Sequence, residues 1–341
     1  MTISRTMKAK SPADLLAIVP AALGFHPEDS LVLLTLGGAT NRFHARLDLP
    51  RDPALFGAVA ESLISATSRH RVDRCVLVAY TDDQCAGQGL VDVVRDALEE
   101  DGVRVVEAIR ADGERWYSLT GCTGPCCPAD GTPYDVASHP FTAQAVLDGQ
   151  VTLGSRQELV DSLIGTDPDA VEAVGEGADE AMRRFQASAR HPLGPPAPES
   201  ARRHLVQEGQ WVAERVRRFL ADGEALDPAE VGRLLVGMVA IEIRDVAWAE
   251  MTRENAGRHV DLWRDVVRRS PHDLMAAPAA LLGFAAWLSG DGALAWCAVE
   301  RCQDVEPDYR LAALLTDALA GAVPPSSWQP VPKEELTLFA S

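Results

Sequence analysis

The sequence predicts an α/β protein, with α+β as the alternative: a mixed sheet with flanking helices, followed by an all-helical domain. Between residues 30 and 120, short apolar runs alternate with amphipathic stretches of helical length, a pattern typical of strands joined by helices. Beyond residue 128 the strand pattern ends and helical periodicity continues. A length of 341 residues also exceeds the usual size of one domain, so we expect two.

The first half is expected to run helix, two strands, helix, strand, helix, two strands. Residues 11–14 begin the first helix, because a serine cap, a proline at the first helical position and an early carboxylate follow one another. Strands are expected at 30–36, 43–49, 74–80, 103–110 and 115–120, and helices between them at 52–68 and 89–100. Helices of this length between strands favour parallel neighbours joined by right-handed crossovers.

The second half is expected to be helical. Helices are expected at 141–147, 155–164, 169–190, 199–222, 227–251, 255–269, 274–289, 292–304 and 308–320. The proline-rich run 191–198 cannot continue a helix, so we expect a linker there. The expected domains are an α/β domain ending in a cysteine-rich loop and short helices (1–165), a connecting helix with the linker (166–198), a helical domain (199–323) and a tail (324–341).

One helical segment, 282–309, resembles a tetratricopeptide hairpin. Two helical runs flank the turn at 290–292, small residues stand where the helices would cross, and Pro307 stops the second helix. There is one clear copy with the start of another, which favours tetratricopeptide-like packing over a long solenoid. We therefore expect a protein partner that binds through the helical domain.

Composition argues against several classes of function. A formal net charge of −18 disfavours nucleic-acid binding, which needs clustered cations. No stretch approaches the about 18 uninterrupted apolar residues of a membrane span. The start of the chain superficially resembles a signal peptide, but the helix start at 11–14 and Pro20 interrupt that pattern, so we expect a cytoplasmic protein with reduced thiols. The motifs of P-loop, dinucleotide-binding, zincin and α/β-hydrolase enzymes are missing from the sequence.

The loop at 121–128 holds three of the seven cysteines, Cys122, Cys126 and Cys127. With His139 they are the candidate metal ligands, and zinc is the candidate ion. Adjacent cysteines in an extended segment point in opposite directions, so Cys126 and Cys127 would not bind one ion together and the set is one ligand short. A disulfide from Cys122 is the second alternative. A tight loop rich in glycine and proline, with partly buried thiols, is favoured over both, and no cofactor is expected.

Three aspartates follow two of the expected strands. If the second and third strands are parallel, Asp52, Asp82 and Asp83 share the rim where open α/β sheets bind ligands, and they could hold a divalent cation or act as a base. Asp52 also suits a helix cap, and the other two suit turn positions, which is the role we favour. His26, in the polar connector before the first strand, is a weaker acid/base candidate.

The phrases SPADLLAIVP at 11–20 and LGFHPEDSLVLL at 23–34 resemble an actinobacterial family of unknown function, domain-of-unknown-function family 4192. The resemblance continues through 46–50, 122–128, 153–159 and the terminal helical hairpin, and so covers nearly the whole chain. It implies a source and a boundary but no reaction, and it provides no catalytic residues to carry over.

The sequence therefore predicts a cytoplasmic interaction or regulatory module without catalysis of its own. The alternative is a small-ligand-binding protein or metal-dependent enzyme, with its site at the strand ends or the cysteine loop. A pocket at the strand ends with converging carboxylates would favour the alternative. A filled sheet rim with an exposed apolar groove on the helical domain would favour docking.

Overall fold

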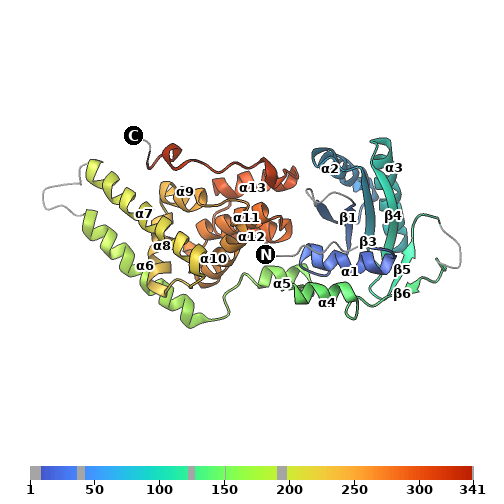
Figure 1. The fold of residues 1–341 in the computed structure, drawn as a ribbon, viewed down its shortest axis with the longest axis horizontal. Helices are drawn as coiled ribbons and strands as arrows, with labels where there is room; N and C mark the ends of the chain where they lie inside the picture. Colours follow the sequence, from blue (N-terminus) through green and yellow to red (C-terminus); the bar gives the residue numbers. More distant parts are fainter. Residues whose placement is uncertain (1–8, 37–42, 122–126, 150, 190–197, 340–341) are drawn as a thin grey trace. The chain divides into compact units, whose positions relative to one another are not determined.

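The computed structural model describes residues 9–36, 43–121, 127–149, 151–189 and 198–339 (Figure 1). The chain divides into two compact units. Unit 1 comprises Met1–Leu159 with Gly321–Val323, and unit 2 comprises Val160–Ala320 with Pro324–Ser341. In the described part of the chain, no helix has the length and apolar character needed to cross a membrane.

Unit 1 is built on a mixed sheet, as the sequence predicts. Six strands lie in the order β2-β1-β3-β4-β5-β6. β3 and β4 are parallel, whereas each of the other neighbouring pairs is antiparallel. The strands are β1 (Ser30–Thr35), β2 (His44–Asp48), β3 (Arg74–Tyr80), β4 (Arg104–Ala111), β5 (Arg115–Ser118) and β6 (Thr132–Pro133).

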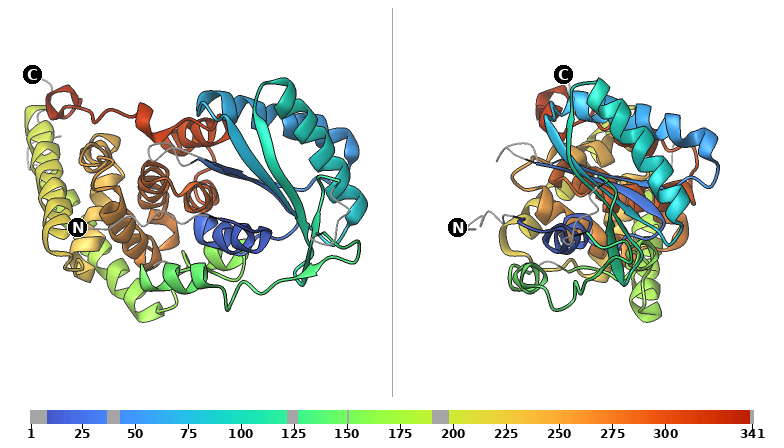
Figure 2. Two further views of the ribbon diagram at one scale, coloured as in Figure 1. Left: turned by 45° about the vertical axis from the view of Figure 1, so that its right-hand side comes forward. Right: turned by 90° about the vertical axis from the view of Figure 1, so that its right-hand side faces the viewer.

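Helices cover both faces of this sheet. The helices α2 (Phe56–Arg69) and α3 (Gln84–Glu100) lie on one face, and α1 (Pro12–Leu23) lies on the other (Figures 1 and 2). Because successive strand residues point to opposite faces, Leu31 and Leu33 of β1 join the core beneath α2 and α3. The helix α4 (Pro140–Leu147) packs beside α1.

The first helix begins as its sequence predicts. The Ser11 hydroxyl accepts a hydrogen bond from the Asp14 N–H at 3.2 Å, and the Asp14 carboxylate accepts one from the Ser11 N–H at 3.0 Å. This reciprocal pair satisfies two N–H groups that have no partner inside the helix. Gly24 ends α1 in the left-handed conformation, at φ 79°.

Unit 2 is helical. A short helix, α5 (Arg156–Asp161), crosses the boundary between the units. The remaining helices are α6 (Pro168–Ala189), α7 (Pro198–Asp222), α8 (Pro228–Met238), α9 (Ile241–Ala249), α10 (Ala256–Arg269), α11 (Ala276–Ser289), α12 (Gly292–Gln303) and α13 (Arg310–Ala320), with short 3₁₀ turns η2 (His272–Leu274), η3 (Pro325–Ser327) and η4 (Lys333–Glu335).

The centre of unit 2 is α11, which is apolar on every side and buried from Ala276 to Leu288. It packs between α10 and α12. Gly283 lets α12 approach closely, because a Cβ at this position would already lie 3.3 Å from the Val299 side chain and 3.4 Å from the Ala295 carbonyl oxygen. Small residues on α11 therefore determine how near its neighbours lie.

One expected helix is two helices in the structure. The pattern at 227–251 predicts a continuous helix, but α8 ends at Met238 and α9 begins at Ile241. The backbone of Ala240 is extended, at φ −78° and ψ 119°. The break allows α8 to pack on α6 while α9 packs on α7, so its cause is tertiary packing and local periodicity could not reveal it.

Candidate functional site

Two of the three candidate aspartates at the sheet rim cap helical segments. β1 lies between β2 and β3 and is antiparallel to both, so β2 and β3 point the same way without being neighbours. The Asp52 carboxylate accepts a hydrogen bond from the Ala54 N–H at 2.9 Å, which caps the 3₁₀ turn η1 (Pro53–Leu55). The Asp83 carboxylate caps α3 in the same way, through the Ala86 N–H at 2.9 Å. Asp82 is exposed.

The buried guanidinium of Arg110 fills the end of the parallel strand pair. Arg110 is 5% exposed, and its Nη1 donates to the Thr81 carbonyl oxygen at 3.0 Å. Its guanidinium carbon lies 4.0 Å from the centroid of the Tyr117 ring. Gly87 makes room for it, because a Cβ there would lie 3.1 Å from Arg110 Cδ. Carbonyl dipoles and an aromatic face thus compensate the buried cation.

A second polar contact closes the same edge. The Tyr117 hydroxyl donates to Asp112 Oδ2 at 2.8 Å. Burial raises the pKa of the Asp112 carboxyl, but hydrogen bonds from the Arg115 N–H, the Tyr117 hydroxyl and the Glu114 N–H outweigh it and lower the pKa overall. The sequence does not single out Arg110 as a functional residue. Because side chains alternate along a strand, its position in β4 places it on the face of the sheet opposite to Ile109 and Ala111.

The two histidine candidates lie in different settings. His26 is exposed in the connector between α1 and β1, and its backbone N–H donates to the Leu153 carbonyl oxygen at 3.0 Å. His139 caps α4: its Nδ1 accepts from the Phe141 N–H at 3.2 Å, and its Nε2 donates to Asp14 Oδ1 at 3.1 Å. A neutral imidazole has only one acceptor nitrogen, and in His139 that nitrogen caps α4. Binding a metal would use this acceptor, so α4 would lose its cap.

Of the cysteine candidates, the structure describes one. Cys122 and Cys126 lie outside the described residues, and Cys127 is half-buried. Among the residues that the structure describes, no group of three or more His, Cys, Asp or Glu side chains is arranged to hold a metal ion.

A groove in unit 2 provides a site that the sequence did not reveal. It lies between α6, α7 and α8 and has a volume of about 590 Å³. Its polar lining includes Arg184 and His204. Phe185 is 43% exposed and Val239 is 66% exposed, so large apolar side chains meet solvent at its edge. The apolar lining consists mainly of Met182, Phe185, Leu205, Val236, Val239 and Ile243.

Two glycines set the floor of the groove. A Cβ on Gly232 of α8 would lie 2.3 Å from the Ala178 nitrogen, and one on Gly177 of α6 would lie 2.8 Å from the Pro228 carbonyl oxygen. The backbones of α6 and α8 are therefore in direct contact at this crossing. α7 packs instead on α9, so α6 and α7 form two walls above α8.

The charged side chains of the groove pair with one another. Arg233 binds Glu208 through two hydrogen bonds, at 3.0 and 2.9 Å, and its guanidinium carbon lies 4.1 Å from the Trp211 ring centroid. The Glu180 carboxylate accepts from both Arg183 and Arg184, and these hydrogen bonds lower its pKa. The apolar floor is thus bordered by ion pairs.

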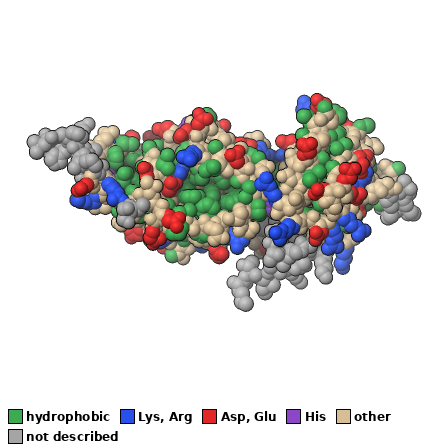
Figure 3. Space-filling model, turned by 90° about the horizontal axis from the view of Figure 1, so that it is seen from above, with side chains coloured by type: hydrophobic (Ala, Val, Ile, Leu, Met, Phe, Trp, Pro, Cys, Tyr) green, Lys and Arg blue, Asp and Glu red, His purple; other side chains and the backbone are tan. Residues whose placement is uncertain are grey.

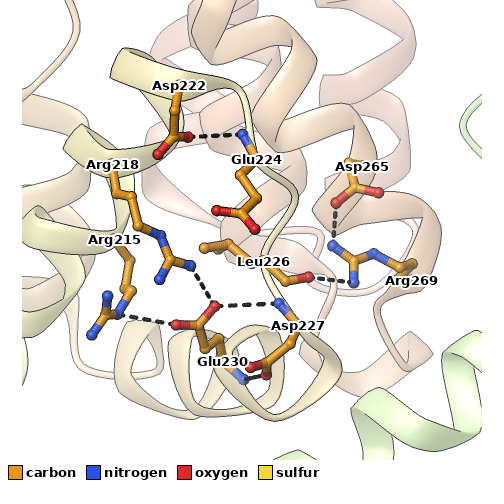
Figure 4. Close-up of polar contacts among 9 residues, drawn as sticks. All are labelled: Arg215, Arg218, Asp222, Glu224, Leu226, Asp227, Glu230, Asp265 and Arg269. Carbon is orange, nitrogen blue, oxygen red and sulfur yellow. Dashed lines mark hydrogen bonds and ion pairs between the residues drawn. The ribbon is translucent and has the colours of Figure 1, made fainter.

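Further along α7, arginines support the fold. Arg215 and Arg218 both pair with Glu230, at 3.3 and 2.6 Å (Figure 4). Glu230 also accepts from the Asp227 N–H at 3.2 Å, which completes the capping box at the start of α8. These two arginines join α7 to α8, so their charges are paired inside the unit.

Comparison with known proteins identifies a family. A family model described as Domain of unknown function (DUF4192) matches residues 12–326. The chain belongs to this family. No curated protein and no solved structure matches the chain. The family resemblance in the sequence is thus confirmed, whereas the actinobacterial source and the tetratricopeptide likeness stay predictions. The description of the DUF4192 family names no activity.

Proposed function

We propose that the protein is a non-catalytic interaction module whose helical unit binds an apolar segment of a protein partner in the groove between α6, α7 and α8. The observation that carries the proposal is the groove itself. Its volume of about 590 Å³ falls in the range of binding sites, and its lining is mainly apolar. Exposed apolar patches bordered by polar residues mark interaction surfaces.

The surface of unit 2 agrees with this proposal. Viewed from above, hydrophobic side chains gather on the exposed face of the helical unit, with acidic and basic side chains around them (Figure 3). Met182 and Phe185 stand three residues apart on α6, so they lie on one side of the helix. Met182, Phe185 and Val239 are 36%, 43% and 66% exposed, so each forgoes a fraction of the roughly 1.5–3 kcal/mol that complete burial of a large apolar side chain contributes. A bound segment would recover part of it.

The alternative of an enzyme or small-ligand site at the strand ends has less support. Asp52 and Asp83 already accept backbone N–H groups, and the Arg110 side chain fills the ends of β3 and β4. The tetratricopeptide-like packing that we propose for α11 and α12 also fits a docking role. Their hairpin turns at Gly290, at φ 90°, and brings small residues of both helices together.

The proposal is tested by placing a charge in the groove. Phe185→Glu should reduce the fluorescence gain of bound anilinonaphthalene sulfonate several-fold. It should also abolish crosslinking of a partner protein to a photoreactive amino acid placed at position 182. Both effects are expected because a ligand in the groove would bury the new carboxylate, which costs free energy. Leu314→Glu is the matched control: Leu314 is 60% exposed on α13 and does not line the groove. A partner that crosslinks equally to the wild type and to Phe185→Glu would contradict the proposal.

A further inference from the structure

We infer that the segment held in this groove is a short amphipathic α-helix with carboxylates beside its apolar stripe. This inference rests on the proposed function and specifies the chemistry of the partner. Three features carry it: the helical walls of the groove, its length, and the arginines where α6 ends and α7 begins.

The walls favour a helical occupant. α6, α7 and α8 satisfy their backbone hydrogen bonds internally, so the groove presents side chains and lacks a strand edge along its described lining. An extended segment would bury its own N–H and C=O groups without partners, at a cost of about 1–3 kcal/mol each. A helix satisfies those groups itself and packs its ridges into the grooves of neighbouring helices.

The length of the groove limits the occupant to a few turns. The lining residues of α6 run from Gly177 to Phe185. At 1.5 Å per residue this is roughly 13 Å, or about two and a half helical turns. A helix of that length presents apolar residues at i, i+3, i+4 and i+7, the spacing of anchors in helix-in-groove recognition.

The groove lies beside a basic stretch in an otherwise acidic chain, where α6 ends and α7 begins. The whole chain has 50 Asp and Glu against 32 Lys and Arg. The described parts of 180–203, at the end of α6 and the start of α7, contain four arginines and two glutamates. The side chains of Arg183 and Arg184 are 65% and 75% exposed. Arg203 is exposed on the other wall, next to His204 of the lining.

These arginines retain donors for a partner. Arg183 and Arg184 share the single carboxylate of Glu180, and a guanidinium has five N–H donors. Carboxylates on a bound helix could accept the remaining N–H groups, and a basic helix would meet like charge here. Charge complementarity therefore selects an acidic amphipathic helix.

A peptide selection tests this inference on the full-length protein. A displayed library of peptides of about 15 residues is selected on the wild type and counter-selected on Phe185→Glu, and the recovered peptides are synthesised with a fluorescent label. We expect sequences with apolar residues at helical spacing and Asp or Glu beside them. Their helicity, measured by circular dichroism, should rise on binding. Their affinity should fall as salt is added, because exposed charges are screened within about 10 Å at 0.1 M ionic strength.

Variants distinguish the contribution of the arginines to peptide binding from that of the apolar lining. We expect Phe185→Glu to weaken binding of the acidic peptides at least about tenfold, and the pair Arg184→Glu and Arg203→Glu to weaken it about five- to tenfold. Arg69→Glu is a charge reversal at the exposed end of α2 in unit 1, so it should leave binding unchanged. Thermal unfolding followed by circular dichroism checks that each variant is folded.

The outcomes distinguish the inference from the proposed function. Recovered peptides that are basic, or extended and proline-rich, and that still require Phe185 would overturn the acidic helix but leave docking in the groove intact. Failure to recover any peptide that distinguishes the wild type from Phe185→Glu would overturn both. Saturable binding of palmitate, lost in Phe185→Glu and without peptide enrichment, would also overturn both in favour of a small apolar ligand.

Discussion

His259 is a titratable side chain held entirely inside the helical unit, with none of its surface exposed. Its Nε2 lies 3.3 Å from the Glu250 carbonyl oxygen, and its Nδ1 has no hydrogen-bond partner among the described residues. Burial lowers the pKa of His259 to about 4, only partly opposed by that contact. The sequence places His259 in an amphipathic helix, but no feature of the neighbouring residues indicates that its ring faces the core.

At this scale, stability should depend on pH through His259. The folded-state pKa of about 4 lies below the reference value of 6.5, so the unfolded chain takes up the proton first. The contribution of neutral His259 to the free energy of unfolding is complete above about pH 6.5 and is lost as the pH falls toward 4. From about pH 7.5 to about pH 5 the loss should be about 2 kcal/mol. Urea unfolding at both pH values measures it, and equal pH dependence in His259→Leu would contradict the assignment.

At the scale of elements, the crossing of α6 and α8 shows how glycine is used. The Gly175-Glu176-Gly177 sequence lacks the context of a dinucleotide-binding loop, and the structure shows a different use for its second glycine. Gly177 and Gly232 allow the two backbones to touch, which positions the floor of the groove. Apolar periodicity predicts both helices. It cannot predict where they cross, because that depends on which helices pack together in the fold.

Gly232→Ala should therefore destabilise the helical unit by about 2–4 kcal/mol, because the added Cβ meets the backbone of α6 at 2.3 Å. The loss should outweigh the gain in helix propensity of about 1 kcal/mol. Gly257→Ala is the control, since a Cβ on this α10 residue has nothing within 4 Å. Chemical denaturation compares the two variants, and equal stability would show that α6 and α8 do not cross so closely.

At the scale of the whole molecule, the chain consists of two units with separate cores. In unit 1, Leu77 lies fully buried beneath α2 and α3, and in unit 2, α11 is surrounded by other helices. Separate cores of this kind can unfold separately. Against a net charge of −18, the arginines beside the groove form a local exception.

Scanning calorimetry should accordingly resolve two unfolding transitions. Leu77→Ala leaves a cavity in unit 1 that costs about 2–5 kcal/mol, and it should lower the midpoint of one transition only. Gly232→Ala should lower the other. If both variants shift one common transition by similar amounts, the two units unfold as one cooperative structure and the expectation is wrong.

Local interactions determined what the sequence alone could predict: the α/β class with its helical second half, the helix start at Ser11, and most helices and strands to within a few residues. Caps and apolar periodicity act between residues close in the chain, so they can be recognised without a fold. The tertiary structure alone decided that β1 separates β2 from β3, that Arg110 fills the sheet rim, and that α6, α7 and α8 enclose an apolar groove. These features join residues far apart in the chain, and their burial depends on which elements pack together.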